Sequence, residues 1–263
     1  MITGYIEAFG SFFSCFAASA GRLFLFFVSG VHQIFSPPFQ TGKVLDHIWF
    51  IGAKSVFVIL LTGLFTGMVL GLQGYYTLVT FGSEAALGTA VSLTLIRELG
   101  PVLGAIMVTA RAGSAMAAEI GVMRMSEQID ALFTMQIDPV RFVFTPRLLA
   151  AILSFPLLTA LFDMVGILGG YLSGSLLLGI NEAAYMDRVI HSVKMADILG
   201  GFFKSFVFAV VVTTICCYRG YYSHKNHQGA FGAKAVSLAT TSAVVQSCVC
   251  VLICDYVITS FLV

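Results

Sequence analysis

Two adjacent residues of opposite charge, Arg97 and Glu98, interrupt a long apolar run, and Pro101 follows them. In a lipid bilayer such a pair costs on the order of several kcal/mol unless the groups pair, reach the interface or face a wet cavity, so it marks a candidate site. Proline removes a backbone donor, and a membrane helix tolerates it only where neighbouring helices or water satisfy the freed carbonyl. Both features predict that this stretch faces the inside of a helix bundle.

A polar segment follows the same run without a break, and it predicts a short helix from Glu127 to Gln136. Ser126 can cap this helix, and the acids Glu127 and Asp130 in its first turn suit the positive end of the helix dipole. The Asp138-Pro139 pair is expected to end it. Its apolar residues recur at the spacing of one helix face: Ile129, Leu132 and Phe133. A short amphipathic helix between two spans has the form of a surface offered to a soluble partner.

The motifs of ATP binding and of hydrolytic catalysis are absent from the sequence. Gly42-Lys43 lacks both the upstream glycine and the following Ser or Thr of a phosphate-binding loop. There is no HExxH, no GxSxG and no Ser-His-Asp set in a water-accessible place. His224 and His227 have no third ligand nearby, so solvated loop histidines are favoured over a metal site. We therefore expect a chain that is not an enzyme, holds no cofactor or metal, and receives its energy from outside.

The composition is that of an integral membrane protein. Hydrophobic residues make up 58% of the chain and charged residues 10%, and the mean hydropathy is +0.95. Soluble domains have about 45–50% apolar and about 25% charged residues. The net charge of +1 argues against nucleic acid as a partner, because there is no basic patch to neutralise phosphates.

Five stretches reach the length of about 20 apolar residues that crossing a bilayer requires, which predicts an all-α membrane fold. They are Ile48 to Leu72, Ala86 to Ala118, Leu148 to Leu178, Ile198 to Tyr218 and Val236 to Val263. The second is too long to cross upright, so it is expected to tilt, to kink at Pro101 or to project beyond the bilayer. The polar segment from Asn181 to Asp197 can hold another short helix. Three further charged residues within spans are explained at least as well by pairing between helices as by function: Asp163, Lys204 and Asp255.

The N-terminal segment from Ile6 to Phe35 is rich in Phe but is interrupted by polar residues and glycines: Glu7, Gly10, Gly21 and Arg22. These interruptions favour a helix that lies in the membrane interface, and a true span is the alternative. We therefore divide the chain into an interfacial region, residues 1–43, and a transmembrane domain, residues 44–263.

Two spans carry glycines at every fourth position, which places them on one helix face and allows another backbone to come close. The first stripe is Gly63, Gly67 and Gly71, and the second is Gly166, Gly170 and Gly174. Both stripes are predicted to be helix-packing seams.

The orientation in the membrane follows from the lysines and arginines, which favour the cytoplasmic side. One set of loops and ends carries most of them: Arg22, Lys43, Arg124, Arg141, Arg147, Arg219, Lys225 and Lys234. The opposite loops carry only Arg188 and Lys194. This asymmetry predicts that the N-terminal helix and the short helix from Glu127 to Gln136 are cytoplasmic.

The stretch from Leu93 to Ala150 resembles the signature of the MlaE (YrbE) permease family, the membrane subunits of ABC transporters that move lipids. Its most specific part is EIGxMxxxEQIDAL followed by DP, which begins at Glu119. The glycine-rich third span, a GFFKS segment and a YRGYY loop match as well, so the resemblance covers nearly the whole chain.

The resemblance implies a homodimer in the bacterial inner membrane that moves phospholipids and maintains outer-membrane lipid asymmetry. Its lipid pocket would lie between the protomers, open toward the periplasm and be capped by an MCE-domain protein. A cytoplasmic ATPase subunit would hydrolyse ATP, and a small STAS-domain protein is a further implied partner.

The resemblance also assigns residues. Leu70, Leu78 and Phe81 match the apolar part of the family's lipid pocket, and Arg97 and Glu98 would lie near a lipid headgroup. We favour this role over an internal salt bridge that only fixes helix packing, because charges within membranes usually mark pathways. The segment implied to dock the ATPase contains Glu119, Gly121, Met123, Glu127, Gln128, Asp130, Ala131 and Leu132.

Two other classes of protein remain as alternatives. A secondary transporter or channel acting without an ATPase would use charge within the membrane but would need no docking helix. A structural scaffold would tolerate charge swaps at Arg97 and Glu98. The short helix between the second and third spans favours the ABC permease over both.

Overall fold

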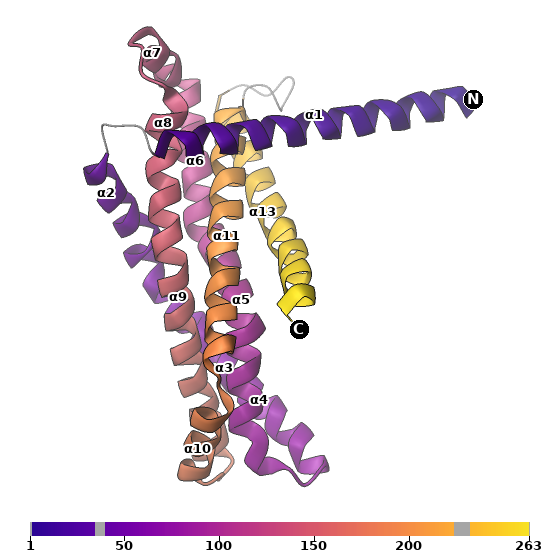
Figure 1. Ribbon diagram of the computed structural model, residues 1–263, viewed down its shortest axis with the longest axis vertical. Helices are drawn as coiled ribbons and strands as arrows, with labels where there is room; N and C mark the ends of the chain where they lie inside the picture. The colour runs from indigo at the N-terminus through magenta and orange to yellow at the C-terminus, as the bar shows by residue number, and fades with distance from the viewer. Residues whose placement is uncertain (1, 35–39, 224–231, 263) are drawn as a thin grey trace.

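Five membrane-length helical stretches form the body of the molecule (Figure 1). The computed structural model describes residues 2–34, 40–223 and 232–262, and side chains from residue 18 onward. Every regular element in these ranges is a helix. The stretches long and apolar enough to cross a membrane are Thr41–Thr80, Glu84–Met125, Pro139–Leu177, Met195–Tyr221 and Ala233–Leu262. The predicted all-α membrane fold with five spans is therefore confirmed.

The N-terminal helix α1 (Ile2–Ile34) runs across one end of the bundle instead of along it, as expected of an interfacial helix (Figure 1). It attaches through one face. Phe26 is buried, and its ring lies 5.0 Å from that of Phe144 and 5.7 Å from that of Tyr221, measured between centroids. One turn on, the carbonyl of Gly30 accepts a hydrogen bond of 3.3 Å from Thr145 Oγ1. Aromatic packing at the end of the bundle thus fixes the position of α1.

The first span consists of two helices, α2 (Thr41–Ile51) and α3 (Val56–Thr80), joined by the short 3₁₀ turn η1 (Ala53–Ser55). It begins seven residues before the predicted Ile48, so the predicted boundary at residue 43 falls within the first turn of α2.

The second span is a continuous helix with two wider, π-helical turns. After η2 (Glu84–Ala86) its parts are α4 (Leu87–Thr94), the π turn η3 (Leu95–Leu99), α5 (Gly100–Val108), the π turn η4 (Thr109–Gly113) and α6 (Ser114–Met125). Each π turn carries one arginine, Arg97 or Arg111. Such turns often occur at functional sites because they re-aim side chains. Pro101 lies in the first turn of α5, directly after η3.

The predicted short helix is present as α7 (Gln128–Thr134), but its ends differ from the prediction. Ser126 does not cap it, because Ser126 Oγ donates to the carbonyl of Val122 and ends α6. Glu127 and Gln136 flank α7 with left-handed backbones, at φ of 60° and 58°. Asp138 does not end α7 but caps the next helix, α8 (Pro139–Val143), by accepting from the N–H of Val140 at 2.9 Å.

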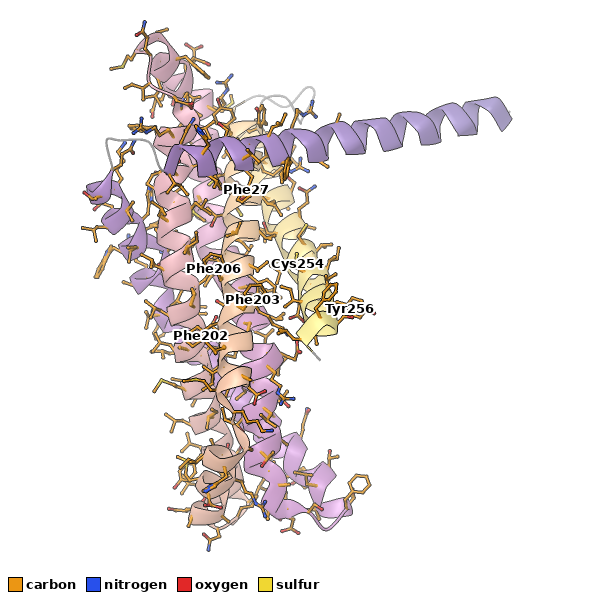
Figure 2. The ribbon with its side chains drawn as sticks, viewed as in Figure 1. Phe27, Phe202, Phe203, Phe206, Cys254 and Tyr256 are labelled. Atoms are coloured by element: carbon orange, nitrogen blue, oxygen red, sulfur yellow. The ribbon has the colours of Figure 1, made fainter. Side chains whose placement is uncertain are left out.

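The remaining spans are regular. The third is α9 (Thr145–Tyr171), which ends in the π turn η5 (Leu172–Leu177), and the fourth and fifth are α11 (Met195–Tyr221) and α13 (Ala233–Leu262). The short helix expected after the third span is α10 (Glu182–Ser192), capped by Asn181. Phe203 and Phe206 of α11 and Tyr256 of α13 are exposed, which suits a surface surrounded by lipid (Figure 2). His224 and His227 lie outside the described residues.

The two glycine stripes are buried where helices touch. A Cβ on Gly67 would lie 1.8 Å from the carbonyl oxygen of Gly166, so α3 and α9 meet backbone to backbone. The stripe on α9 also faces the second span and α10: a Cβ on Gly170 would lie 2.7 Å from Val91 and from Tyr185 Oη. Gly169, which the sequence pattern did not single out, is as close to α3, since its Cβ would lie 2.3 Å from the carbonyl oxygen of Leu64.

We predict that Gly67→Ala destabilises the protein, because the new methyl group meets main-chain atoms that cannot turn away. Overpacking of a core costs about 1–3 kcal/mol, and backbone contact belongs at the upper end. Thermal unfolding of the detergent-solubilised protein is the measurement. Gly104→Ala is the matched control, since its Cβ would lie 3.6 Å from Thr159 Oγ1, an ordinary contact. Equal melting temperatures for the two variants would show that α3 and α9 are not this close.

The orientation predicted from the basic residues can be tested at exposed positions on opposite ends of the bundle. Gln128 is exposed at α7, and Asp187 is exposed on α10 (Figure 1). In a background without cysteines, we expect Gln128→Cys to react with an impermeant thiol reagent only from the cytoplasm and Asp187→Cys only from the periplasm. The opposite pattern would invert the topology.

Candidate functional site

A pocket of about 360 Å³ contains the charged pair that the sequence singled out. It lies between η3, α11 and α13, toward the C-terminal end of α13. Its lining residues are Arg97, Glu98, Ala196, Asp197, Gly200, Gly201, Lys204, Thr259 and Leu262. The second, fourth and fifth spans therefore meet at a polar site within otherwise apolar helices.

Lys204 is the centre of this site, and its side chain is 3% exposed. Its Nζ donates to Glu98 Oε2 and to Thr259 Oγ1, each at 2.7 Å, and Asp255 Oδ1 lies 3.0 Å away. Thr259 Oγ1 in turn donates to Glu98 Oε1 at 3.2 Å. An ammonium has three protons to donate, and a buried charge is tolerated only when such partners surround it.

The third proton of Lys204 serves the backbone. Nζ lies 2.9 Å from the carbonyl oxygen of Arg97. Pro101, four residues later, has no N–H with which to bond that carbonyl. The Arg97 carbonyl, which Pro101 leaves without its usual donor, thus receives a hydrogen bond from Lys204 on the neighbouring helix α11.

Arg97 points away from Lys204 and pairs with Asp197 at the start of α11. Its Nε donates to Asp197 Oδ1 at 2.8 Å. The Arg97 side chain remains 52% exposed, whereas that of Asp197 is 11% exposed. Within the described residues this bond engages Nε, and the two terminal nitrogens of the guanidinium, in a side chain that lines the pocket, donate no hydrogen bond. Such a fork can hold a phosphate or carboxylate through two parallel hydrogen bonds.

The three other charged residues within spans, Asp163, Lys204 and Asp255, have different surroundings. Lys204 and Asp255 pair between helices, which is the structural alternative that the sequence analysis gave for them. Asp163 does not: its Oδ1 is buried without a hydrogen-bond partner among the described residues, and a Cβ on Gly100 would lie 1.8 Å from it. The sequence analysis did not identify Asp197 as the partner of Arg97. Asp197 lies at the end of a polar segment, and no sequence pattern connects it to Arg97.

The predicted apolar lipid contacts lie elsewhere on the chain. Leu70 and Leu78 of α3 pack partly against the main core, and Phe81, just after α3, is exposed. None of the three lines the pocket that holds Arg97 within the described part of one chain. Their common role in a lipid pocket stays a prediction.

The predicted docking residues divide into exposed and packed groups. Glu127, Gln128, Asp130 and Ala131 are exposed, and Leu132 is half-buried. Two acids in this region hold structural partners: Asp130 Oδ1 lies 2.7 Å from Arg124 Nη1, and Glu119 Oε2 lies 2.9 Å from the buried Arg147.

The remaining two docking residues lie inward on α6. Gly121 is buried, and its Cβ would meet Val236 of α13 at 3.4 Å. Met123 packs against the second core cluster, which also contains Ile129 of α7. Phe133, expected on the same stripe as Ile129, is instead 56% exposed.

The charged pocket combines paired carboxylates with a half-exposed guanidinium. The described residues contain no group of three or more His, Cys, Asp or Glu side chains placed to hold a metal ion. The pocket offers no Ser or Cys beside a histidine base, and its carboxylates are occupied by Lys204, Thr259 and Arg97. What it presents to the outside is one oriented guanidinium.

Comparison with known proteins agrees with the architecture. A family profile described as "Permease MlaE" matches residues 44–261. An intermembrane phospholipid transport system permease protein of Haemophilus influenzae is 40% identical over 100% of this chain and 98% of its own length. A probable ABC transporter permease protein of Rickettsia felis is 42% identical over 93% of this chain and 92% of its own. The chain therefore belongs to the MlaE permease family.

Proposed function

We propose that this protein is the membrane permease subunit of an ABC transporter that moves phospholipids between the inner membrane and a periplasmic MCE-domain protein. In this role it maintains the lipid asymmetry of the outer membrane. The relative from Haemophilus influenzae is named as the permease of an intermembrane phospholipid transport system, which supports the choice of substrate. ATP hydrolysis belongs to a partner subunit, because this chain has no phosphate-binding loop.

The half-exposed guanidinium of Arg97 is the observation that carries the proposal. Asp197 holds it through Nε, and Arg97 lines a pocket bounded by membrane-spanning helices. A phospholipid headgroup carries the phosphate that such a fork binds in two parallel hydrogen bonds. The ion pair between the buried Lys204 and the partly exposed Glu98 links α11 to η3, the turn from which Arg97 projects.

The lipid pocket is completed by a second copy of the chain. ABC transporters work with two membrane halves, so Leu70, Leu78 and Phe81 of two protomers would enclose the acyl tails. Exposed apolar residues along α3 give that helix a face for lipid or for the second protomer: Phe57, Leu61, Phe65, Val69 and Leu72. A single chain would thus contribute the headgroup ligand and half of the apolar wall.

The partner ATPase, in this proposal, docks on α7 at the cytoplasmic end. Phe133 and Met135 are 56% and 66% exposed there, beyond the spans (Figure 1). These exposed apolar side chains lie next to the acids Glu127 and Asp130. Together they form a surface with an apolar centre and a charged rim, which is the usual arrangement of a protein interface.

We predict that Arg97→Ala lowers the amount of phospholipid that co-purifies with the assembled complex by about tenfold or more, since a charge-assisted hydrogen bond contributes about 1.5–3 kcal/mol. Arg97→Lys should retain part of the binding, because a point charge does not reproduce the planar fork. Phospholipid per complex and outer-membrane integrity in cells are the measurements. Wild-type values for Arg97→Ala would place the headgroup elsewhere.

Lys204→Met serves as the contrasting variant. It leaves Glu98 and Asp255 without their shared cation, and breaking a buried pair costs about 3–5 kcal/mol. We expect it to reduce the yield of folded protein, whereas Arg97→Ala should leave the yield unchanged. If both variants fold poorly, Arg97 acts in packing and the lipid assignment loses its support.

We predict that Phe133→Glu weakens binding of the ATPase by about tenfold or more, because a buried aromatic anchor of an interface contributes about 2 kcal/mol or more. Membrane insertion should be unaffected, since Phe133 is exposed in the isolated chain. Ile190→Glu on α10 is the matched control: Ile190 is 71% exposed at the opposite end of the bundle. Co-purification of the ATPase is the measurement, and equal recovery with both variants would exclude α7 as the docking surface.

A further inference from the structure

Two positive charges lie where the first span is broken. Arg111, on the π turn η4, donates from Nη1 to the carbonyl oxygen of Phe50 and, at 3.1 Å, to Ser55 Oγ. Lys54, in the turn η1 that forms the break, is exposed. Both cations lie beside the Phe50 ring: Lys54 Nζ is 5.6 Å from its centroid and Arg111 Cζ is 4.9 Å from it. We call Lys54 and Arg111 the midspan cations.

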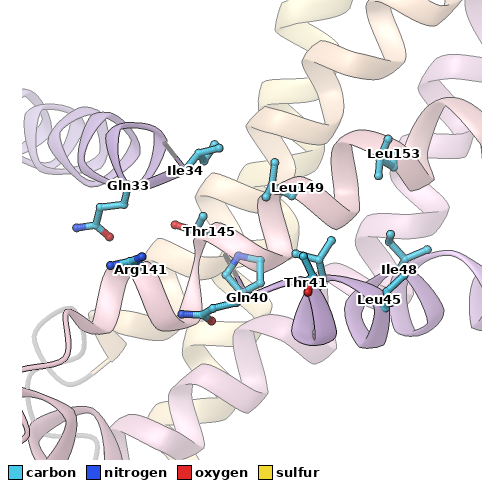
Figure 3. A pocket seen from close by; sticks show the side chains of 12 residues that line it. Gln33, Ile34, Gln40, Thr41, Leu45, Ile48, Arg141, Thr145, Leu149 and Leu153 are labelled. Atoms are coloured by element: carbon cyan, nitrogen blue, oxygen red, sulfur yellow. The ribbon is translucent and has the colours of Figure 1, made fainter. Parts of the chain in front are cut away.

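No acid of the described chain neutralises the midspan cations. The acceptors of Arg111 are a carbonyl and a hydroxyl, which carry no charge, and Lys54 forms no hydrogen bond or ion pair with the described residues. Where the cavity between α2 and α9 approaches the break, its walls are apolar (Figure 3): Leu45, Ile48, Leu149 and Leu153. Like charges repel strongly where the dielectric constant is low, so this arrangement calls for an anion.

Measured from the interfacial helix α1, the midspan cations lie near the middle of the bilayer. Gly52, beside them, faces α9, because a Cβ on Gly52 would lie 3.1 Å from Ser154 Oγ. Thr145, nine residues earlier on α9, is the residue that bonds to α1. Nine residues of helix span about 13.5 Å, and one leaflet of the hydrocarbon core is about 15 Å deep. A charge at this depth is costly unless it faces water or binds an anion, so it marks a functional site.

An apolar cavity of about 290 Å³ lies between α3 and α5, on the side of the midspan cations that leads toward α10. Met107, in its wall, lies about one turn before Arg111 on the second span. Leu61, in the opposite wall, lies about two turns after Lys54 on the first span. A ligand that fills this cavity and reaches the midspan cations must therefore combine an anionic group with a hydrocarbon chain.

We propose that Lys54 and Arg111 form a second headgroup site, which holds the phosphate of a phospholipid while an acyl chain occupies the cavity between α3 and α5. The inference rests on the proposed function, in which the permease moves phospholipids. Arg111 Nη1 is engaged by the protein, so the phosphate accepts from the other N–H groups of the guanidinium and from the flexible Lys54. Arg111 and Arg97 are fourteen residues apart, or about 21 Å of helix, so the second span offers a moving lipid two successive cationic sites.

Photo-crosslinking in the full-length protein tests this proposal. Photoreactive p-benzoylphenylalanine replaces Leu61 in the cavity or, as a reporter of surrounding lipid, Leu157, which is 66% exposed on α9. The protein is placed in vesicles of phosphatidylethanolamine and phosphatidylglycerol, and mass spectrometry identifies the adduct. We expect Lys54→Ala to reduce the phospholipid adduct at position 61 by about tenfold and to leave that at position 157 unchanged. Lys54→Arg keeps the charge and should retain most of the adduct.

Three outcomes at position 61 would overturn the proposal. The first is a phospholipid adduct that Lys54→Ala leaves unchanged, as expected if surrounding lipid fills the cavity or if free phosphate occupies the cations. The second is an equal loss with Lys54→Arg, which would make shape the cause instead of charge. The third is an adduct to protein, which would show that a second chain fills the cavity. Folding is not at stake in Lys54→Ala, because Lys54 is exposed and donates no hydrogen bond within the described chain.

Two controls complete the design. Arg188→Ala removes an exposed basic residue from α10, far from the cavity, and should leave the adduct at position 61 unchanged. A probe at Leu262, which lines the charged pocket, separates this inference from the proposed function. The adduct at position 262 should depend on Arg97 and not on Lys54. If Arg97→Ala leaves it unchanged, the proposed headgroup role of Arg97 fails, whereas the midspan site is judged at position 61 alone.

Discussion

The buried charge of Lys204 is the constraint on which the arrangement of three spans depends. Its ammonium needs three acceptors within the bundle, and these come from Glu98 and the Arg97 carbonyl on η3 and from Thr259 on α13. If α11 slid or rotated relative to either neighbour, a charge would be left unpaired, at a cost of about 3–5 kcal/mol. One side chain thus sets the register of the second, fourth and fifth spans.

The same placement decides what Arg97 can do. Consecutive residues of a helix point about 100° apart, so they cannot both face Lys204. Glu98 turns inward and bonds to it, and Arg97 turns toward Asp197 and the pocket. Both residues therefore form ion pairs, but with different partners: Glu98 with Lys204 and Arg97 with Asp197. The Arg97 side chain stays 52% exposed, and the predicted role of the two residues at a lipid headgroup stays a prediction.

Local features of the sequence predicted most of the fold. Apolar length predicted the five spans, and polar interruptions predicted the interfacial helix, because both depend only on neighbouring residues. The partners of Arg97 and Lys204 lie up to about a hundred residues away and follow no spacing rule, so pairing could not be assigned. The Ser126 cap was predicted wrongly because a serine can equally bond back to the preceding turn, as it does to Val122. The π turns that aim Arg97 and Arg111 also left no sequence signal.

The second span connects the charged pocket to α7. Arg97 lies on one π turn, and Arg111 on the next donates to Ser55 at the break in the first span. Between and beyond these turns the span is unbroken helix as far as Met125. This rigid helix can transmit a displacement of α7 to η3. Coupling also requires a contact with two arrangements. Lys204 is the poorer candidate, because its side chain is only 3% exposed and three hydrogen bonds hold it, whereas the Arg97 side chain is 52% exposed and is held by one bond to Asp197. In the proposed function, this bond is therefore the place where release of a lipid headgroup would be controlled.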